Sequence, residues 1–268
     1  MAERVLYHYT SAGGLLGIIE SGTLWASDCR FLNDATELSY STEQLLAALS
    51  TLEDDTMGPE SGFILPGVVE HLTAETFRVH VVCFCEDGDL LSQWRAYGAD
   101  GGYAVGFGSD RLWNSEPQAI LIQNRELVRV VYGFDAVRAN LEARAREIAE
   151  RRTGHPGANA HNETKSLMPL LAGIKHPAFS EEREWRLVTT RYVPPYQPTE
   201  PDTALKVRVS QVGFVPYYEI PFPSHAVREI VIGPGRHAEE RVDGVKQLLN
   251  ARAMREVQVR VSAVPLRA

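Results

Sequence analysis

Cysteine is scarce in this sequence, whose 268 residues include only Cys29, Cys83 and Cys85. Three cysteines make no disulfide framework, and no second ligand pair stands at zinc-site spacing, so we expect reduced core thiols and no bound metal. No apolar run approaches the roughly 18 residues of a membrane helix. The start Met-Ala-Glu-Arg does not resemble a signal peptide. These absences predict a cytoplasmic protein that does not enter a membrane.

An excess of basic residues and the common catalytic motifs are also missing. The net charge is −8, whereas a general nucleic-acid or membrane-surface binder carries a basic field. The sequence holds no Gly-x-Ser-x-Gly elbow, no phosphate-loop lysine motif and no His-Glu-x-x-His. Several familiar hydrolase and nucleotidase classes are therefore excluded.

What is present is an ordinary globular composition, with 44% hydrophobic and 23% charged residues. Strand and helix patterns are interspersed without strict alternation, which favours an α+β fold over a doubly wound parallel sheet. Apolar periodicity predicts strands at 5–9, 23–26, 78–85, 103–107, 120–121, 127–132, 184–190, 204–209, 215–220, 229–232 and 257–261. It predicts helices at 35–49, 63–77, 89–97, 135–152, 161–171 and 237–253, of which 135–152 should mostly face water.

The first thirty residues hold the clearest local signals. Ser11 can cap a helix because its hydroxyl accepts from the free amides of the first turn, and Gly22 suits the left-handed residue that ends one. His8 then ends a strand just before a helix N-terminus, where anionic groups such as phosphates are favoured. On spacing alone, a partly buried histidine bonded to backbone is the favoured explanation of His8.

A charged pair at 184–186 is more informative. In a strand, Glu184 and Arg186 share one face while Trp185 lies on the other, which should be core. The pair is explained either as an exposed ion pair on an edge strand, which contributes little to stability, or as a carboxylate presented to a cleft.

Other polar groups have structural explanations of comparable or greater weight. Asn33 or Asp34 suits a helix cap with Glu37 in capping-box range, and Gly233-Pro234-Gly235 suits a tight turn. Arg208 and Arg267 are candidate contacts to a pyrophosphate or an acceptor. On the short helix predicted at 89–97, Trp94 and Tyr97 are neighbours that more often pack in a core than stack on a ligand.

Eight segments spread over the chain carry a resemblance to a known family. They are Tyr7-His8-Tyr9-Thr10-Ser11, Leu24-Trp25-Ala26-Ser27, Phe31-Leu32-Asn33-Asp34 with Glu37, Cys83-Phe84-Cys85-Glu86, Gln93-Trp94-Arg95-Ala96-Tyr97-Gly98, Glu184-Trp185-Arg186, Ile232-Gly233-Pro234 and Val264-Pro265-Leu266-Arg267. With them the chain resembles the bacterial family of domain of unknown function 2971, DUF2971. Its opening also resembles ADP-ribosyltransferase-like domains. That resemblance implies a mixed, mainly antiparallel central sheet with peripheral helices, in one domain over 1–268 with helical insertions at about 35–77 and 135–172.

The same resemblance implies an activity and a set of site residues. The activity would be NAD-dependent ADP-ribosyl transfer or NAD cleavage, with NAD as substrate and a protein, nucleic acid or water as acceptor. Glu184 would supply the catalytic carboxylate, with Arg186 keeping it ionised and Glu181 and Glu182 as reserves. The residues implied in NAD binding are His8, Tyr9, Thr10, Trp94, Arg95 and Tyr97. A toxin or phage-defence role, with a regulatory partner protein, fits a family of this type.

The sequence departs from better-known transferases at one place. Cys83-Phe84-Cys85-Glu86 stands where a middle-strand aromatic-and-serine motif is expected. Two other functions therefore stay open. One is a non-catalytic module that binds a nucleotide or a partner on the same fold, and the other is a hydrolase acting on a nucleoside or a phosphorylated RNA end.

Overall fold

A computed structural model of the chain describes residues 4–32, 36–56, 64–98, 101–110, 125–133, 135–150, 159–193, 202–210 and 212–265. Its strands are β1 Val5–Thr10, β2 Thr23–Asp28, β3 Phe77–Cys85, β4 Tyr103–Gly108, β5 Arg125–Arg129, β6 Val131–Tyr132, β7 Ile174–Lys175, β8 Glu184–Tyr192, β9 Lys206–Ser210, β10 Gly213–Pro221, β11 Val227–Ile232 and β12 Gln258–Val261. Its α-helices are α1 Ala12–Ser21, α2 Thr36–Thr56, α3 Ile64–Thr73, α4 Leu91–Tyr97, α6 Asp135–Glu150, α7 Ala160–Ala172 and α8 Ala238–Ala251. The short 3-10 helices are η1 Cys29–Phe31, η3 Pro177–Glu182 and η4 Ser224–Ala226.

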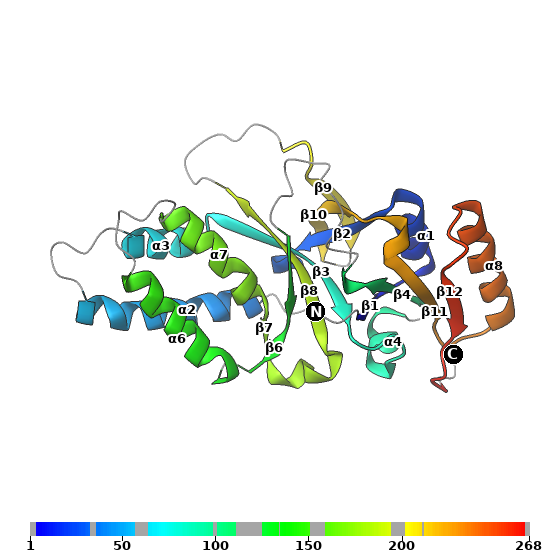
Figure 1. Cartoon of the computed structure of the whole chain (residues 1–268), viewed down its shortest axis with the longest axis horizontal. Helices are drawn as coiled ribbons and strands as arrows, with labels where there is room; N and C mark the ends of the chain where they lie inside the picture. Colours follow the sequence, from blue (N-terminus) through cyan, green and yellow to red (C-terminus); the bar gives the residue numbers. More distant parts are fainter. Residues whose placement is uncertain are drawn as a thin grey trace.

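The centre of the protein is a mixed, mostly antiparallel sheet, so the α+β class is confirmed (Figure 1). Its main path runs β12-β11-β4-β1-β3-β2-β10-β9, and β8 joins it by pairing with both β3 and β5. Among the described pairs of this sheet, β11 with β12 is parallel and the others are antiparallel. A second sheet consists of the parallel pair β6 and β7.

A fork in the sheet separates β1 from β2 along one edge of β3. One edge of β3 pairs with β8 along its whole length. The other edge is shared, because β2 pairs with it at His80 and Val81 whereas β1 pairs with it at Cys85. Between these points, at 82–84, no described strand pairs with this edge. β1 and β2 therefore diverge from β3 and leave a gap between them.

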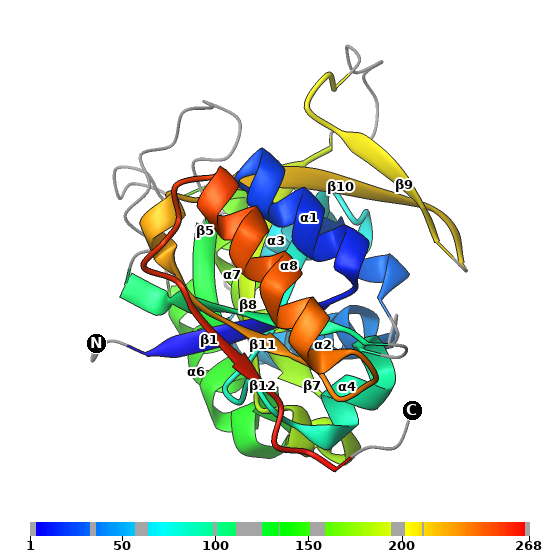
Figure 2. The same ribbon diagram turned by 90° about the vertical axis from the view of Figure 1, so that its right-hand side faces the viewer.

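Two helical layers cover the sheet. Helices α1 and α8 lie at one end, and α2, α3, α6 and α7 gather at the other, as Figures 1 and 2 show. The alternation of β3 explains this arrangement: Val82 and Phe84 belong to the core cluster that includes α1 and α8, whereas Val79 and Val81 belong to the cluster of the other four helices. Both faces of β3 are therefore buried.

Local signals at the start of the chain are confirmed. The Ser11 hydroxyl accepts from the Gly14 amide at 3.1 Å and caps α1, and Gly22 ends that helix at a φ of 64°. The helix predicted at 89–97 instead begins at Leu91, and Asp89 is not its cap. The Asp89 carboxylate accepts from the Trp94 indole nitrogen at 2.8 Å and from the Ala263 amide at 2.7 Å. It therefore holds the chain after β12 against α4.

Helix α6 mostly faces water, as predicted, because most of its described residues outside the apolar line are exposed. Its narrow apolar line is completely buried among α2, α3 and α7, and consists of Val137, Leu141, Ala145 and Ile148. The apolar stripe gave the right face, but the sequence did not show that three other helices would cover it. The helix predicted at 63–77 ends at Thr73, because Phe77 already begins β3.

Candidate functional site

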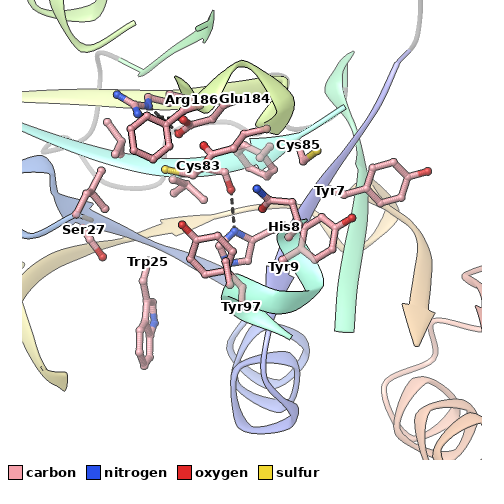
Figure 3. A pocket seen from close by; sticks show the side chains of 18 of the residues that line it. Tyr7, His8, Tyr9, Trp25, Ser27, Cys83, Cys85, Tyr97, Glu184 and Arg186 are labelled. Carbon is pink, nitrogen blue, oxygen red and sulfur yellow. Dashed lines mark hydrogen bonds and ion pairs between the residues drawn. The ribbon is translucent and has the colours of Figure 1, made fainter. Parts of the chain in front are cut away.

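A cavity of about 430 Å³ lies at the fork of β1, β2 and β3. Its walls come from these strands, from η1, α4, η3 and β8, from the end of β7 and from the middle of β9. Figure 3 shows the lining side chains, with His8 and Tyr97 near the centre and Glu184 and Arg186 at one end. This volume lies in the range typical of small-molecule sites, roughly 300 to 1,000 Å³.

His8 is fixed by the fork itself. Its ring Nδ1 lies 2.9 Å from the carbonyl oxygen of Cys83, on the edge of β3 where no described strand pairs. A carbonyl only accepts, so Nδ1 carries the proton and donates. Burial lowers the pKa of His8, so the ring is neutral near pH 7. The other nitrogen, Nε2, is then an acceptor for a hydroxyl group.

Glu184 and Arg186 form a buried bidentate ion pair at the end of the cavity. Arg186 Nε donates to Glu184 Oε1 at 2.7 Å and Nη2 donates to Oε2 at 3.0 Å. The two residues are only 4% and 3% exposed. Of the two explanations offered by the sequence, the exposed ion pair on an edge strand is therefore wrong, because β8 is interior, paired with β3 and β5.

Lys175 on β7 completes a charge network that the sequence did not indicate. Its Nζ donates to Glu184 Oε2 at 3.0 Å and to Glu182 Oε2 at 2.7 Å. Burial by itself would raise the pKa of Glu184, but the charge and hydrogen bonds of Arg186 and the charge of Lys175 outweigh it and lower that pKa to about 2. Glu184 is therefore ionised throughout the physiological range.

The carboxylate of Glu184 has no spare acceptor capacity in this arrangement. Arg186 supplies two donors and Lys175 one, and the Cys83 thiol is a fourth hydrogen-bond partner. A carboxylate offers about four lone-pair sites. A ligand hydroxyl can therefore reach Glu184 only by replacing one of these donors, and the weakest of them is the thiol.

Acid should remove the stabilisation that the ionised Glu184 provides. Its pKa is about 2 in the folded protein against an ordinary 4.5. Because the folded value is the lower one, the unfolded chain binds more protons between the two, and stability falls as the pH drops from about 5 toward 2. The shift corresponds to about 3 kcal/mol of folding stability.

In urea titrations, the difference in the free energy of unfolding between wild type and Glu184→Gln should narrow by about 2 kcal/mol between about pH 7 and pH 3. A difference that stays constant would contradict this.

The structure brings some of the predicted site residues to the cavity and places others elsewhere. His8, Tyr9, Tyr97, Glu184 and Arg186 line it, as does the reserve residue Glu182. The Tyr9 hydroxyl is already used, because it donates to the Asp87 carbonyl and accepts from the Leu90 amide. Tyr9 therefore offers a ligand only part of its ring.

Four predicted residues are not among those that line this cavity. Trp94 is completely buried, with its ring 4.7 Å from that of Tyr9, and belongs to the core. Arg95 is exposed on the outer side of α4, Thr10 lies beyond the cavity on β1, and Glu181 is exposed. Trp94 and Tyr97 are neighbours at i, i+3 on α4, but Trp94 belongs to the core whereas Tyr97 lines the cavity.

Several other predictions concern residues with a structural role or residues outside the described part. The turn at 233–235 is held by Arg241, which donates to the Gly233 carbonyl at 2.8 Å, so a tight turn explains it. Outside the described residues lie Asn33, Asp34, Arg267, the side chain of Glu37 and the strand predicted at 120–121.

Among the residues described, no three or more histidine, cysteine, aspartate or glutamate side chains are grouped to hold a metal ion. In the same part of the chain, no helix is both long enough and apolar enough to cross a membrane.

The fold and the cavity define an α+β protein whose ligand-sized, charged cavity lies at a fork in a mainly antiparallel sheet. Residues 93–187 match the model of a family described as protein of unknown function (DUF2971), which supports the family that the motifs predict. The matched stretch includes both Tyr97 and Glu184. No curated protein and no solved structure matches the chain. The resemblance to ADP-ribosyltransferases therefore stays a prediction.

Proposed function

We propose that this cavity binds NAD or a related nucleotide and that the protein cleaves the bond between nicotinamide and ribose, transferring ADP-ribose to an acceptor or to water. One observation carries the proposal. His8 and Glu184, which are far apart in the sequence, line the same cavity, one as a neutral hydrogen-bond acceptor and the other as an ionised carboxylate. A ribose presents hydroxyl donors, which Nε2 of His8 accepts directly and which Glu184 accepts once one of its present donors gives way.

The chemistry uses these two groups in different ways. His8 Nε2 accepts from a ribose hydroxyl and fixes the sugar, while the exposed ring of Tyr97 offers a surface for a flat base. When the glycosidic bond breaks, its electron pair leaves with nicotinamide and positive charge develops on the ribose. A fixed carboxylate next to that charge stabilises the transition state. The acceptor oxygen then bonds to the ribose carbon and releases its proton to water.

The saturation of Glu184 favours a second candidate, a non-catalytic nucleotide-binding module. Arg186 and Lys175 place two cations within 3.0 Å of the carboxylate, and these oppose positive charge on a ribose. Catalysis on this site therefore requires Lys175 or the Cys83 thiol to give way to the substrate. The two candidates predict the same ligand and differ in whether nicotinamide is released.

His8→Phe tests the proposal because it keeps an aromatic ring and removes the acceptor. We expect kcat/KM for nicotinamide release from NAD to fall about tenfold, the effect of one lost hydrogen bond. The variant also leaves the Cys83 carbonyl without its donor, so unfolding should become easier by about 1–3 kcal/mol.

The assay measures free nicotinamide from purified protein at a temperature where both forms are folded. Tyr40→Phe, on an exposed part of α2, serves as the control and should behave as wild type. Unchanged kcat/KM in His8→Phe would remove His8 from the site. NAD binding without nicotinamide release in wild type would favour the binding module.

A further inference from the structure

The wing formed by β2, β10 and β9 carries a group of side chains that the proposed chemistry does not use. Register places Trp25 and Ser27 of β2, Tyr217 of β10 and Arg208 of β9 on one face of this wing, the face that lines the cavity. In Figure 3, Trp25 and Ser27 lie to one side of His8, whereas Tyr7 and Cys85 lie to the other. The wing therefore extends the cavity away from Tyr7.

Arg208 gives this extension an uncompensated positive charge. Deeper in the cavity, Lys175 and Arg186 are matched by Glu182 and Glu184. Among the described residues, Arg208 forms no ion pair, and its one hydrogen bond is a long one of 3.4 Å to the Ser27 hydroxyl. Lys206 on the same strand is paired with Glu219. An anion at Arg208 would meet a guanidinium that has no competing carboxylate.

An aromatic shelf lies beside this charge. The ring of Trp25 stacks on that of Tyr217 with centroids 4.5 Å apart and planes at 29°. Tyr217 is buried beneath it, whereas Trp25 remains 46% exposed. An exposed indole held flat by a second ring is a stacking surface for a planar base.

We propose that the wing is a second subsite, which binds the phosphate and base of a nucleoside diphosphate. Arg208 and the Ser27 hydroxyl contact the phosphate, and Trp25 stacks on the base. In combination with the proposed function, on which this orientation rests, the nicotinamide ribose lies between His8 and Glu184, and the adenylate half extends over the wing.

ADP is the probe that isolates this subsite, because it lacks nicotinamide and a scissile glycosidic bond to it. We expect ADP to bind the wild-type protein in calorimetric titrations and to bind more tightly than adenosine. Arg208→Gln should weaken ADP binding at least tenfold while leaving adenosine binding unchanged. Trp25→Ala should weaken both ligands at least fivefold, since stacking is lost from each.

Two matched controls come from the opposite face of the wing and from the contact between α1 and the end of α8. Phe214→Ala removes an exposed ring from the opposite face of the wing, and Arg252→Gln removes an exposed arginine at the C-cap of α8 that pairs with Glu20. Both should bind ADP as wild type does. Melting temperatures of all variants show whether each is folded.

Three results would overturn the second subsite: no ADP binding by wild type at millimolar concentration, equal affinity for ADP and adenosine, or an Arg208→Gln variant that binds ADP normally. Failure of the proposed function looks different. ADP binding that depends on Arg208 without any nicotinamide release from NAD would support the subsite and refute cleavage. Nicotinamide release that is indifferent to Arg208 would refute the subsite and support cleavage.

Discussion

Glu184→Gln is expected to abolish nicotinamide release, with a fall in kcat of at least 100-fold, and to destabilise the fold by about 3–5 kcal/mol. Both effects have the same electrostatic origin. The amide cannot stabilise positive charge on a ribose, and it leaves Arg186 buried without its carboxylate. The strand pattern alone does not predict the second effect, which follows from the burial of the pair.

Unfolding alone would also lower the activity of Glu184→Gln. A control variant that loses a similar buried ion pair away from the cavity separates the two effects. Glu163 is 5% exposed and pairs with Arg144 at 3.3 Å on helices remote from the cavity. Glu163→Gln should lose stability and keep its activity per folded molecule. Activity is measured as nicotinamide release, and the folded fraction by circular dichroism in the same buffer. A Glu184→Gln protein that is folded and fully active would move the catalytic role away from Glu184.

Trp94→Ala is expected to lower the free energy of unfolding by about 3–5 kcal/mol. The indole is completely buried against Tyr9, and its nitrogen donates to Asp89, which also binds the chain after β12. Truncating the indole to a methyl group creates a cavity and also removes the hydrogen bond to Asp89. Urea unfolding monitored by circular dichroism measures the loss.

Trp94→Phe is the graded partner of this variant. It keeps most of the ring volume and removes only the hydrogen bond to Asp89, so its cost should be nearer 1–3 kcal/mol. Nucleotide affinity per folded molecule should be unchanged in both variants, because Trp94 is not among the residues lining the cavity. A stable Trp94→Ala protein with selectively weakened NAD binding would instead make Trp94 a ligand contact.

Local chemistry predicted much of the fold. The cap at Ser11, the left-handed Gly22 and the strand around 78–85 were all readable, because each depends on neighbouring residues in the chain. The fork was not readable. It depends on β1 and β2 sharing one edge of β3, and a residue pattern does not say which strands become neighbours.

The sequence likewise predicted only some of the residues of the candidate site. His8 and Glu184 were implied by the family resemblance, and both line the cavity. Lys175 was not predicted, because its strand has only two residues and no periodicity. Trp94 and Tyr97 share a face of α4 in sequence terms, but only the packing of Tyr9 against the helix decides that Trp94 is core.

The most direct test of the account is to observe His8 itself while NAD is added. In nitrogen-15 NMR of the imidazole ring, we expect the neutral tautomer with its proton on Nδ1 and a bare Nε2 in the free protein. Saturating NAD should shift the Nε2 resonance toward that of a hydrogen-bonded acceptor while Nδ1 stays bonded to the Cys83 carbonyl. An Nε2 resonance that does not move at millimolar NAD would contradict nucleotide binding at the fork.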